Sequence, residues 1–327
     1  MKIPGFIDLQ VNGYKGVDFS SMDLAAESFI SVASELFAKG TAAFLPTLIT
    51  SPREVYQRNL PLIAKAMDSP ELKHRILGIH IEGPFLSSQP GAVGAHNPNF
   101  VSAPSIEYLK ELQQWANGKI KLITIAAEID GAEELTRYAV KNGITVSLGH
   151  QMADYNDMSR LADAGAKSIT HLGNGMPNEV NRHKNVLLAG ISNDKLTGMI
   201  ITDGHHLPDF VIKAIIRGKG VSNIIVVSDS SPIAGLKPGT YNVLGNEAVL
   251  EENGLLHNPQ KKCLVGSSAT MLECMNYLTS LDLLSQDELF MVGFYNPLKL
   301  IGLDASSIKN GREIKFNSEK KVFTIVQ

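Results

Sequence analysis

Three residues with metal-binding side chains stand at the ends of apolar segments in this chain. Glu82 ends the run Gly78–Glu82, and His150 and His171 end two later apolar runs in the same way. One carboxylate and two neutral imidazoles can hold a zinc-like divalent ion and leave a coordination position open for water. An open position is typical of a catalytic site, so these residues predict a metal-dependent hydrolase.

Two further residues suit the chemistry that such a metal supports. Asp229 follows another apolar run, and a carboxylate there can take a proton from water and pass it to a leaving amine. His96 lies in the glycine-containing stretch Gly94–Pro98, where an imidazole can polarise a substrate carbonyl. Each has an ordinary alternative, because Asp229 could cap a helix before Pro232 and His96 could be a surface turn residue.

Several loops carry groups that suit a polar or anionic substrate. The stretch His171–Pro177 contains two glycines and an asparagine, so its backbone N–H groups can face an anion or hydroxyls. The cationic cluster Arg182–Lys184 follows, and it suits a phosphate or carboxylate, although such clusters are often only solvated surface. Asp203–His206 adds two histidines, and Leu264–Ser268 precedes a helix whose N-terminus could bind polar groups.

The first apolar run argues against a second metal ion. It carries Gln10 and Asn12, where a His-x-His pair would bind a further ion. Amide side chains bind transition metals poorly. We therefore treat Gln10 and Asn12 as a second-metal region that we expect to be empty.

The apolar runs have the length of strands and alternate with segments of helical period. Predicted helices include Leu24–Ala38, Ser105–Ala116 and Ala132–Lys141, each followed within two residues by a glycine that can end it. Eight strands are expected, at Ile3–Val11, Ala42–Ile49, Ile76–Glu82, Ile120–Ala127, Ile144–His150, Ser168–His171, Gly198–Thr202 and Asn223–Ser228.

This alternation predicts an α/β fold, and more specifically a (β/α)8 TIM-like barrel. Near-continuous apolar strands need both faces covered, and the C-terminal strand ends of such a barrel line the active site. The turn-rich segment Pro238–Lys262 interrupts the pattern as an inserted loop or hairpin. Helices are expected at Ala269–Thr279 and Gln286–Ile301, and residues 313–325 alternate like a short hairpin.

Composition excludes several classes of protein. The chain has 327 residues with 44% hydrophobic residues, which is ample for a large buried core. Its net charge of −3 gives no basic field, so we expect neither nucleic acid nor membrane as a partner. The two cysteines, Cys263 and Cys274, lack metal-type spacing, and no apolar stretch near the start is long enough for a signal peptide. We therefore predict a cytoplasmic location.

The ordered motifs closely resemble the N-acetylglucosamine-6-phosphate deacetylase family of the amidohydrolase superfamily. The resemblance runs from Pro4 to about Gly302. The motifs that carry it are Pro4–Asp8, His80–Pro84, Gly94–Pro98, Gly149–His150, His171–Pro177, Asp203–His206 and Ser228–Asp229. It implies hydrolysis of the acetamide of N-acetylglucosamine 6-phosphate to glucosamine 6-phosphate and acetate.

The resemblance also implies roles for individual residues. One divalent metal, zinc first and iron, manganese or cobalt as alternatives, would bind Glu82, His150 and His171. Asp229 would be the acid/base, and His96 would polarise the acetyl carbonyl. The implied substrate-binding residues are Ala95, His96, Asn174, Gly175, Arg182, His206, Val265, Gly266 and Ser267. In the family the arginine reaches the neighbouring subunit's site, so a homodimer with Arg182 across its interface is expected.

The chain departs from the family in two places. Family members usually begin with some fifty residues that form a small β domain, whereas here almost nothing precedes the barrel. We therefore expect a barrel at residues 1–305 and a short C-terminal β tail at 306–327. The second departure is glycine at both Gly173 and Gly175, which leaves the substrate open. One alternative is a deacetylase of another N-acyl amino sugar, such as N-acetylgalactosamine 6-phosphate. A separate alternative is a non-catalytic sugar-phosphate sensor, against which the intact Glu82, His150, His171 and Asp229 argue.

Overall fold

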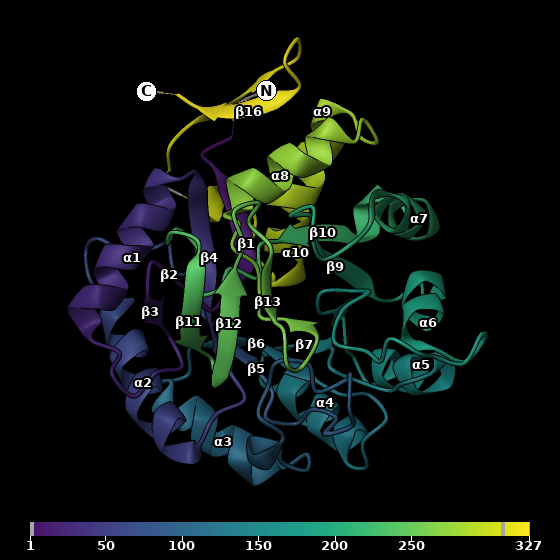
Figure 1. The fold of residues 1–327 in the computed structure, drawn as a ribbon. Helices are drawn as coiled ribbons and strands as arrows, with labels where there is room; N and C mark the ends of the chain where they lie inside the picture. The colour runs from purple at the N-terminus through teal and green to yellow at the C-terminus, as the bar shows by residue number, and fades with distance from the viewer. Residues whose placement is uncertain (1–2, 309–310, 327) are drawn as a thin grey trace.

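The computed structural model describes residues 3–308 and 311–326, and its centre is a sheet of eight parallel strands surrounded by helices (Figure 1). Neighbouring strands pair in chain order, apart from the small strands β2 and β3 that leave the sheet. The eight strands are β1 (Phe6–Val11), β4 (Thr41–Ile49), β5 (Ile79–Glu82), β6 (Ile120–Ile125), β7 (Thr145–Leu148), β8 (Ser168–Ile169), β9 (Thr197–Ile201) and β10 (Ile224–Val227).

The last strand returns to the first, so the sheet closes on itself. Val11 forms a parallel bridge with Ser230, and the N–H of Asn12 donates to the Ser230 carbonyl at 2.8 Å. The N–H of Ser228 also donates to the Asp8 carboxylate at 3.1 Å. The predicted (β/α)8 TIM-like barrel is therefore confirmed.

The strands end earlier than their apolar runs suggest. β7, β8 and β10 each stop two residues before His150, His171 and Asp229, whereas the expected strands ran to the two histidines and to Ser228. These three residues have positive φ angles of 50°, 31° and 50°, which a regular strand cannot contain. β1 begins at Phe6, later than expected.

Helices form the outer layer of the barrel (Figure 1). They cover the sheet with apolar faces, as the helical period predicts. Those between strands are α1 (Ala26–Ala38), α2 (Arg53–Ala66), α3 (Ile106–Trp115), α4 (Ala132–Lys141), α5 (Tyr155–Asp163), α6 (Val186–Ser192) and α7 (Asp209–Lys219). Short elements are β2 (Gly13–Tyr14), β3 (Val17–Asp18), η1 (Pro98–Phe100), η2 (Val221–Asn223) and η4 (Ala305–Ser307).

The two helices after the barrel strands differ in regularity. α8 (Met271–Ser280) is close to the expected segment, but the expected helix Gln286–Ile301 is divided. It consists of α9 (Gln286–Phe290), a π-helical turn η3 (Met291–Tyr295) and α10 (Asn296–Leu300). Pro297 has no N–H to donate to the carbonyl four residues earlier, which explains the widened turn.

The segment that interrupts the strand–helix pattern forms an antiparallel sheet. It contains β11 (Gly239–Val243), β12 (Asn246–Leu250), β13 (Leu256–Asn258) and β14 (Cys263–Leu264). Figure 1 shows β11, β12 and β13 in front of the barrel strands. A separate small core, with Ile233, Val243, Leu250 and Val265 among its members, holds this sheet together.

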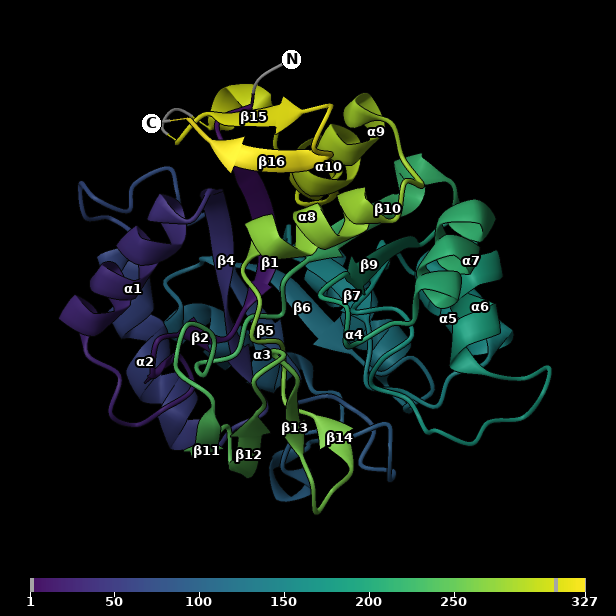
Figure 2. The ribbon, with the colours of Figure 1, turned by 45° about the horizontal axis from the view of Figure 1, so that its top comes forward.

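The C-terminal segment forms the predicted hairpin, with β15 (Ile314–Asn317) and β16 (Val322–Ile325). The hairpin packs on α8 and lies at the top of Figure 2, near the start of the chain. Ile3 bridges Ile314, and the buried ring of Phe323 contacts that of Phe6 in an edge-to-face arrangement with 5.1 Å between centroids. The part of the chain described here contains no helix with the length and apolar character of a membrane span.

Candidate metal centre

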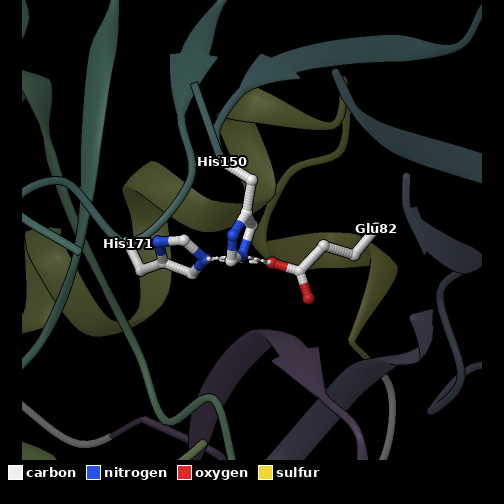
Figure 3. Close-up of side chains that lie close together, drawn as sticks. All are labelled: Glu82, His150 and His171. Carbon is white, nitrogen blue, oxygen red and sulfur yellow. Dashed lines mark hydrogen bonds and ion pairs between the residues drawn. The ribbon is translucent and has the colours of Figure 1, made fainter. Parts of the chain in front are cut away.

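Three strand ends bring the predicted metal ligands together (Figure 3). Glu82 is the last residue of β5, and His150 and His171 follow β7 and β8. The Nε2 atoms of the two histidines are 3.0 Å apart, and those of His171 and His150 lie 3.0 and 3.3 Å from Glu82 Oε1. All three side chains are buried. The structure thus gathers residues that are 68 and 21 positions apart in sequence.

The backbone at these positions turns the side chains toward one point. His150 and His171 are not glycines, yet both have left-handed φ angles. Such a conformation costs about 1–3 kcal/mol per residue and persists only where the surrounding structure enforces it. Backbone strain therefore occurs at two of the three predicted metal ligands, His150 and His171.

The donor atoms fit a divalent cation. The Nδ1 of His150 lies 2.8 Å from the Ala92 carbonyl, which can only accept a hydrogen bond, so a neutral His150 carries its proton on Nδ1 and its lone pair on Nε2. That lone pair faces His171 Nε2 and the Glu82 carboxylate. Three basic atoms so close together repel one another unless a proton or a cation lies among them. One carboxylate and two imidazoles are a common ligand set of zinc and related ions.

The pKa shifts of Glu82 and His171 also favour a bound cation. Although burial disfavours a charged carboxylate, hydrogen bonds with His150 and His171 hold the pKa of Glu82 well below its usual range. Burial also favours a neutral ring at His171, but the hydrogen bond and charge of Glu82 raise the pKa of that imidazole. The pocket therefore concentrates negative charge on Glu82, which a cation would neutralise.

His96 belongs to the same cluster. Its Nε2 is 3.1 Å from His150 Nε2 and 3.8 Å from Glu82 Oε2, and its side chain is buried. Burial and the neighbouring His150 lower the pKa of His96 to about 3, so its ring is neutral at physiological pH. His96 is thus a cluster residue, and the alternative of a surface turn is wrong.

Asp229 lies beside the cluster and is held from both sides. The Nδ2 of Asn12 donates to Asp229 Oδ1 at 2.7 Å, and the N–H of Ser267 donates to the Asp229 carbonyl at 2.8 Å. Burial and the charge of Glu82 raise the pKa of Asp229 to about 6. A carboxyl group with this pKa can exchange a proton near neutral pH. The alternative of a helix cap is wrong, because no helix begins within the described residues that follow Asp229 up to Met271.

The two amides of the first strand act as donors to carboxylates. Gln10 Nε2 donates to Glu82 Oε1 at 3.0 Å, as Asn12 does to Asp229. Their side-chain oxygens are buried and have no partner within the described residues. The amides thus orient both carboxylates.

A cavity of about 670 Å³ opens above the cluster. Its lining includes five predicted substrate-binding residues besides His96, namely Ala95, Asn174, Gly175, His206 and Gly266. Arg182, Val265 and Ser267 do not line it. Arg182 is exposed on its loop, Val265 is buried in the small core of the β11–β14 sheet, and Ser267 bonds to the β10 end through its backbone.

His206 enters the cavity in a fixed orientation. Its Nδ1 lies 2.7 Å from Asp203 Oδ2, and its backbone N–H donates to Asp203 Oδ1. Burial opposes ionisation of Asp203, yet hydrogen bonds with His206 hold the pKa of this carboxyl below its usual range. The other ring nitrogen of His206 is then available to a ligand in the cavity.

Sequence reasoning missed the contribution of the antiparallel sheet. Leu244, Lys261, Lys262 and Cys263 all line the cavity beside the strand-end residues. The available signal was the position of the two lysines, immediately before the Leu264–Ser268 stretch that already pointed to a binding role. The segment Pro238–Lys262 therefore forms part of the site.

Comparisons with known proteins agree with this geometry. The chain matches the amidohydrolase family over residues 1–318. It is 31% identical over 304 residues to the N-acetylglucosamine-6-phosphate deacetylase of Bacillus subtilis (strain 168), covering 92% of this chain and 75% of that protein. The Homo sapiens N-acetylglucosamine-6-phosphate deacetylase is 31% identical over 314 residues, covering 93% and 75%.

A solved structure extends the likeness to three dimensions. The N-acetylglucosamine-6-phosphate deacetylase from Pasteurella multocida matches with a TM-score of 0.86 and 29% identity, covering 99% of this chain and 85% of that one. The similarity to these deacetylases, in sequence and in fold, thus extends over nearly the whole chain. The chain belongs to the amidohydrolase family and, within it, to the N-acetylglucosamine-6-phosphate deacetylases.

Proposed function

We propose that this protein hydrolyses the acetamide of N-acetylglucosamine 6-phosphate, giving glucosamine 6-phosphate and acetate. The observation that carries the proposal is the convergence of Glu82, His150 and His171 beside Asp229, in a cavity large enough for a sugar phosphate. The relatives named for this activity support the choice of substrate. The amidohydrolase family is metal-dependent, which agrees with the ligand set.

Glu82, His150 and His171 would hold one divalent ion, with zinc as the first choice for this mixed nitrogen and oxygen set. When bound, the ion supplies Lewis acidity and lowers the pKa of water to near neutrality. Gln10 orients Glu82 by donating to its Oε1. The backbone carbonyl of Ala92 orients the His150 ring by accepting a hydrogen bond from its Nδ1, as hydrogen-bond partners of metal-binding histidines commonly do.

Asp229 would manage the proton in this reaction. Its carboxylate accepts a proton from water and then delivers it to the amine nitrogen as the C–N bond breaks. Asn12 holds one carboxylate oxygen, so the other remains free for proton transfer. His96 is neutral and buried, and it would act on the acetyl carbonyl by hydrogen bonding from the same cluster.

The remaining cavity residues would orient the sugar. Asn174, Gly175, Ala95 and Gly266 face the cavity, and His206 would contact the phosphate. Gly175 lets its backbone lie close to the His171 ring, because a Cβ at that position would be only 2.9 Å from the ring. Val265 and Ser267 would contribute by supporting this wall.

We further propose a homodimer in which Arg182 recognises phosphate in the neighbouring subunit's site. Arg182 is exposed and does not line the cavity of its own chain, which agrees with a role across an interface. A guanidinium can hold phosphate through two parallel hydrogen bonds. We also propose that the chain divides into a catalytic barrel at residues 1–305 and a β tail at 306–327.

A panel of substrates tests the function directly. Acetate release would be measured with metal-loaded protein from N-acetylglucosamine 6-phosphate, N-acetylgalactosamine 6-phosphate and unphosphorylated N-acetylglucosamine. We expect the first to react fastest. Preference for the second would reassign the substrate, and binding of sugar phosphates with no release of acetate would make the protein a sensor.

A further inference from the structure

Two lysines from the antiparallel sheet line the cavity that contains the metal centre. Lys261 and Lys262 lie in the turn that joins β13 to β14 and face the same space as His96, His206 and Asp229. They are the only lysine or arginine side chains in the described lining of the cavity. The permanent positive charge at this mouth therefore comes from the sheet and not from the barrel.

The turn that carries these lysines is built to a fixed shape. Asn258, which is buried, accepts hydrogen bonds on Oδ1 from the backbone N–H groups of Gln260 and Lys261, both at 3.0 Å. Its Nδ2 donates to Asn246 Oδ1 at 3.3 Å. An asparagine that closes a turn in this way fixes the backbone of the residues that follow.

The ammonium of Lys261 is positioned against the loop that carries His96. Lys261 Nζ donates to Asn246 Oδ1 at 2.7 Å, and Asn246 Nδ2 donates to the Ala95 carbonyl at 2.9 Å. Asn246 is buried, so this chain of hydrogen bonds links the sheet to the loop before His96. The charge is thus held at the rim, beside the reaction centre.

Neither lysine forms an ion pair with a carboxylate in the parts of the chain that the structure describes. The carboxylates that line the cavity are Glu82 and Asp229, and the proposed chemistry uses both. Among the described residues, the only side-chain partner of the Lys261 ammonium is the neutral amide of Asn246. Lys261 and Lys262 are exposed residues that line the cavity. Two adjacent cations with no counter-charge attract an anion into the cavity.

We propose that Lys261 and Lys262 form an anion-recognition site for the phosphate of the substrate. This inference rests on the proposed function and adds to it two charged phosphate contacts within the chain, beside those expected from His206 and from Arg182 of a second copy. An ammonium acts on phosphate as a point charge, so it attracts the group without fixing one geometry. The lysines should therefore affect substrate capture more than bond cleavage.

The test compares charge-removing variants with charge-retaining ones on phosphorylated and unphosphorylated substrates. In metal-loaded protein, Lys261→Gln together with Lys262→Gln should raise KM for N-acetylglucosamine 6-phosphate about ten- to hundredfold and change kcat little. For N-acetylglucosamine the same variant should match the parent protein. The double change to arginine should restore KM, and Lys320→Gln on the distant hairpin should have no effect. Equal losses on both substrates, or an unchanged KM, would overturn the assignment.

A binding measurement separates this inference from the proposed function. Calorimetric titration would compare glucosamine 6-phosphate with glucosamine, neither of which requires hydrolysis. We expect the double glutamine variant to lose about ten- to hundredfold in affinity for the phosphorylated sugar only, with a weaker dependence on salt. If the parent protein binds the phosphorylated sugar through the lysines but releases no acetate, the proposed function fails while the anion site stands. If it releases acetate and the variants bind normally, the anion site alone fails.

Discussion

The barrel mouth and the C-terminal hairpin follow opposite physical rules. At the mouth, Glu82, His96 and Asp229 are buried ionisable residues, and buried atoms such as His171 Nδ1 have no hydrogen-bond partner within the described residues. At the hairpin, the ring of Phe323 is almost completely buried and lies within 6 Å of those of Phe6, Phe290 and Phe316. Figure 2 places the hairpin and β14 at opposite sides of the molecule.

The difference separates function from stability. Burying ionisable groups and holding strained backbone at the mouth costs free energy, which a bound cation and substrate would partly return. Burying aromatic rings at the hairpin stabilises the fold without any chemistry. Substitutions at the mouth should therefore remove activity with little loss of stability, and substitutions at the hairpin should do the reverse.

The largest effect is expected at the metal ligands. Glu82→Ala or His171→Ala should remove most of the metal and nearly all deacetylase activity, because each deletes one of three ligands. Thermal unfolding of the metal-free variants should stay close to that of the metal-free parent protein. Elemental analysis and acetate release would measure both losses.

The same analysis tests the number of ions. We expect one divalent ion per chain, because Gln10 and Asn12 donate hydrogen bonds to Glu82 and Asp229. Removal of this ion by a chelator should abolish activity, and one equivalent of zinc should restore it. Full activity only at two equivalents of zinc would contradict the single-ion site.

The next largest effect is expected at the acid/base. Asp229→Asn should retain the metal and the fold but lose about 10²–10⁴ in rate, which is the usual contribution of a positioned acid/base. The amide has nearly the same shape but cannot carry the proton. An effect smaller than tenfold in protein with a full metal content would exclude Asp229 from this role.

A substitution in the hairpin tests the opposite expectation, a loss of stability without a loss of activity. Phe323→Ala should reduce the free energy of unfolding by about 3–5 kcal/mol, since it removes a fully buried ring that three other aromatic residues contact. The kcat of the folded variant should be unchanged. Phe316→Ala, which truncates a half-buried ring in the same cluster, should cost less. Chemical denaturation would measure the free energy of unfolding, and acetate-release assays would measure kcat. A large fall in kcat for Phe323→Ala would contradict the separation of stability from activity.

The sequence predicted the barrel and the ligand cluster because both depend on local patterns. Apolar runs marked all eight strands, and a barrel places C-terminal strand ends around one opening. Glu82, His150 and His171 could therefore be grouped without any knowledge of distances. The hairpin at residues 313–325 was also predicted correctly, from alternation alone.

The parts that were missed depend on tertiary structure. Pro238–Lys262 was predicted as an inserted loop or hairpin, and the antiparallel β11 and β12 match the second alternative. The full β11–β14 sheet was not predicted, because its strands are short and separated by turns. Nothing local placed Lys261 over the barrel. The positive φ at His150 comes from the surrounding packing and not from residue type. The π-helical turn at Met291–Tyr295 follows from Pro297, but a proline alone does not specify how a helix adapts.

The smallest effect, and the most specific, is expected at Arg182. If its guanidinium holds phosphate equally in the ground and transition states, Arg182→Ala should raise KM for the phosphorylated sugar more than it lowers kcat. Arg182→Lys should also be impaired, because an ammonium cannot form the two parallel hydrogen bonds. Unphosphorylated N-acetylglucosamine should react as with the parent protein. Equal losses on both substrates would make Arg182 structural.

Mixed dimers would show which subunit's site Arg182 serves. A chain with Arg182→Ala has an intact metal centre, and a chain with Asp229→Asn has an intact arginine. If Arg182 acts across the interface, a dimer of one of each contains one fully intact site, so activity should return on mixing. Verified mixed dimers without recovered activity would place Arg182 in its own chain's site. The mouth would then be complete within one subunit, with Lys261 and Lys262 as its other cations.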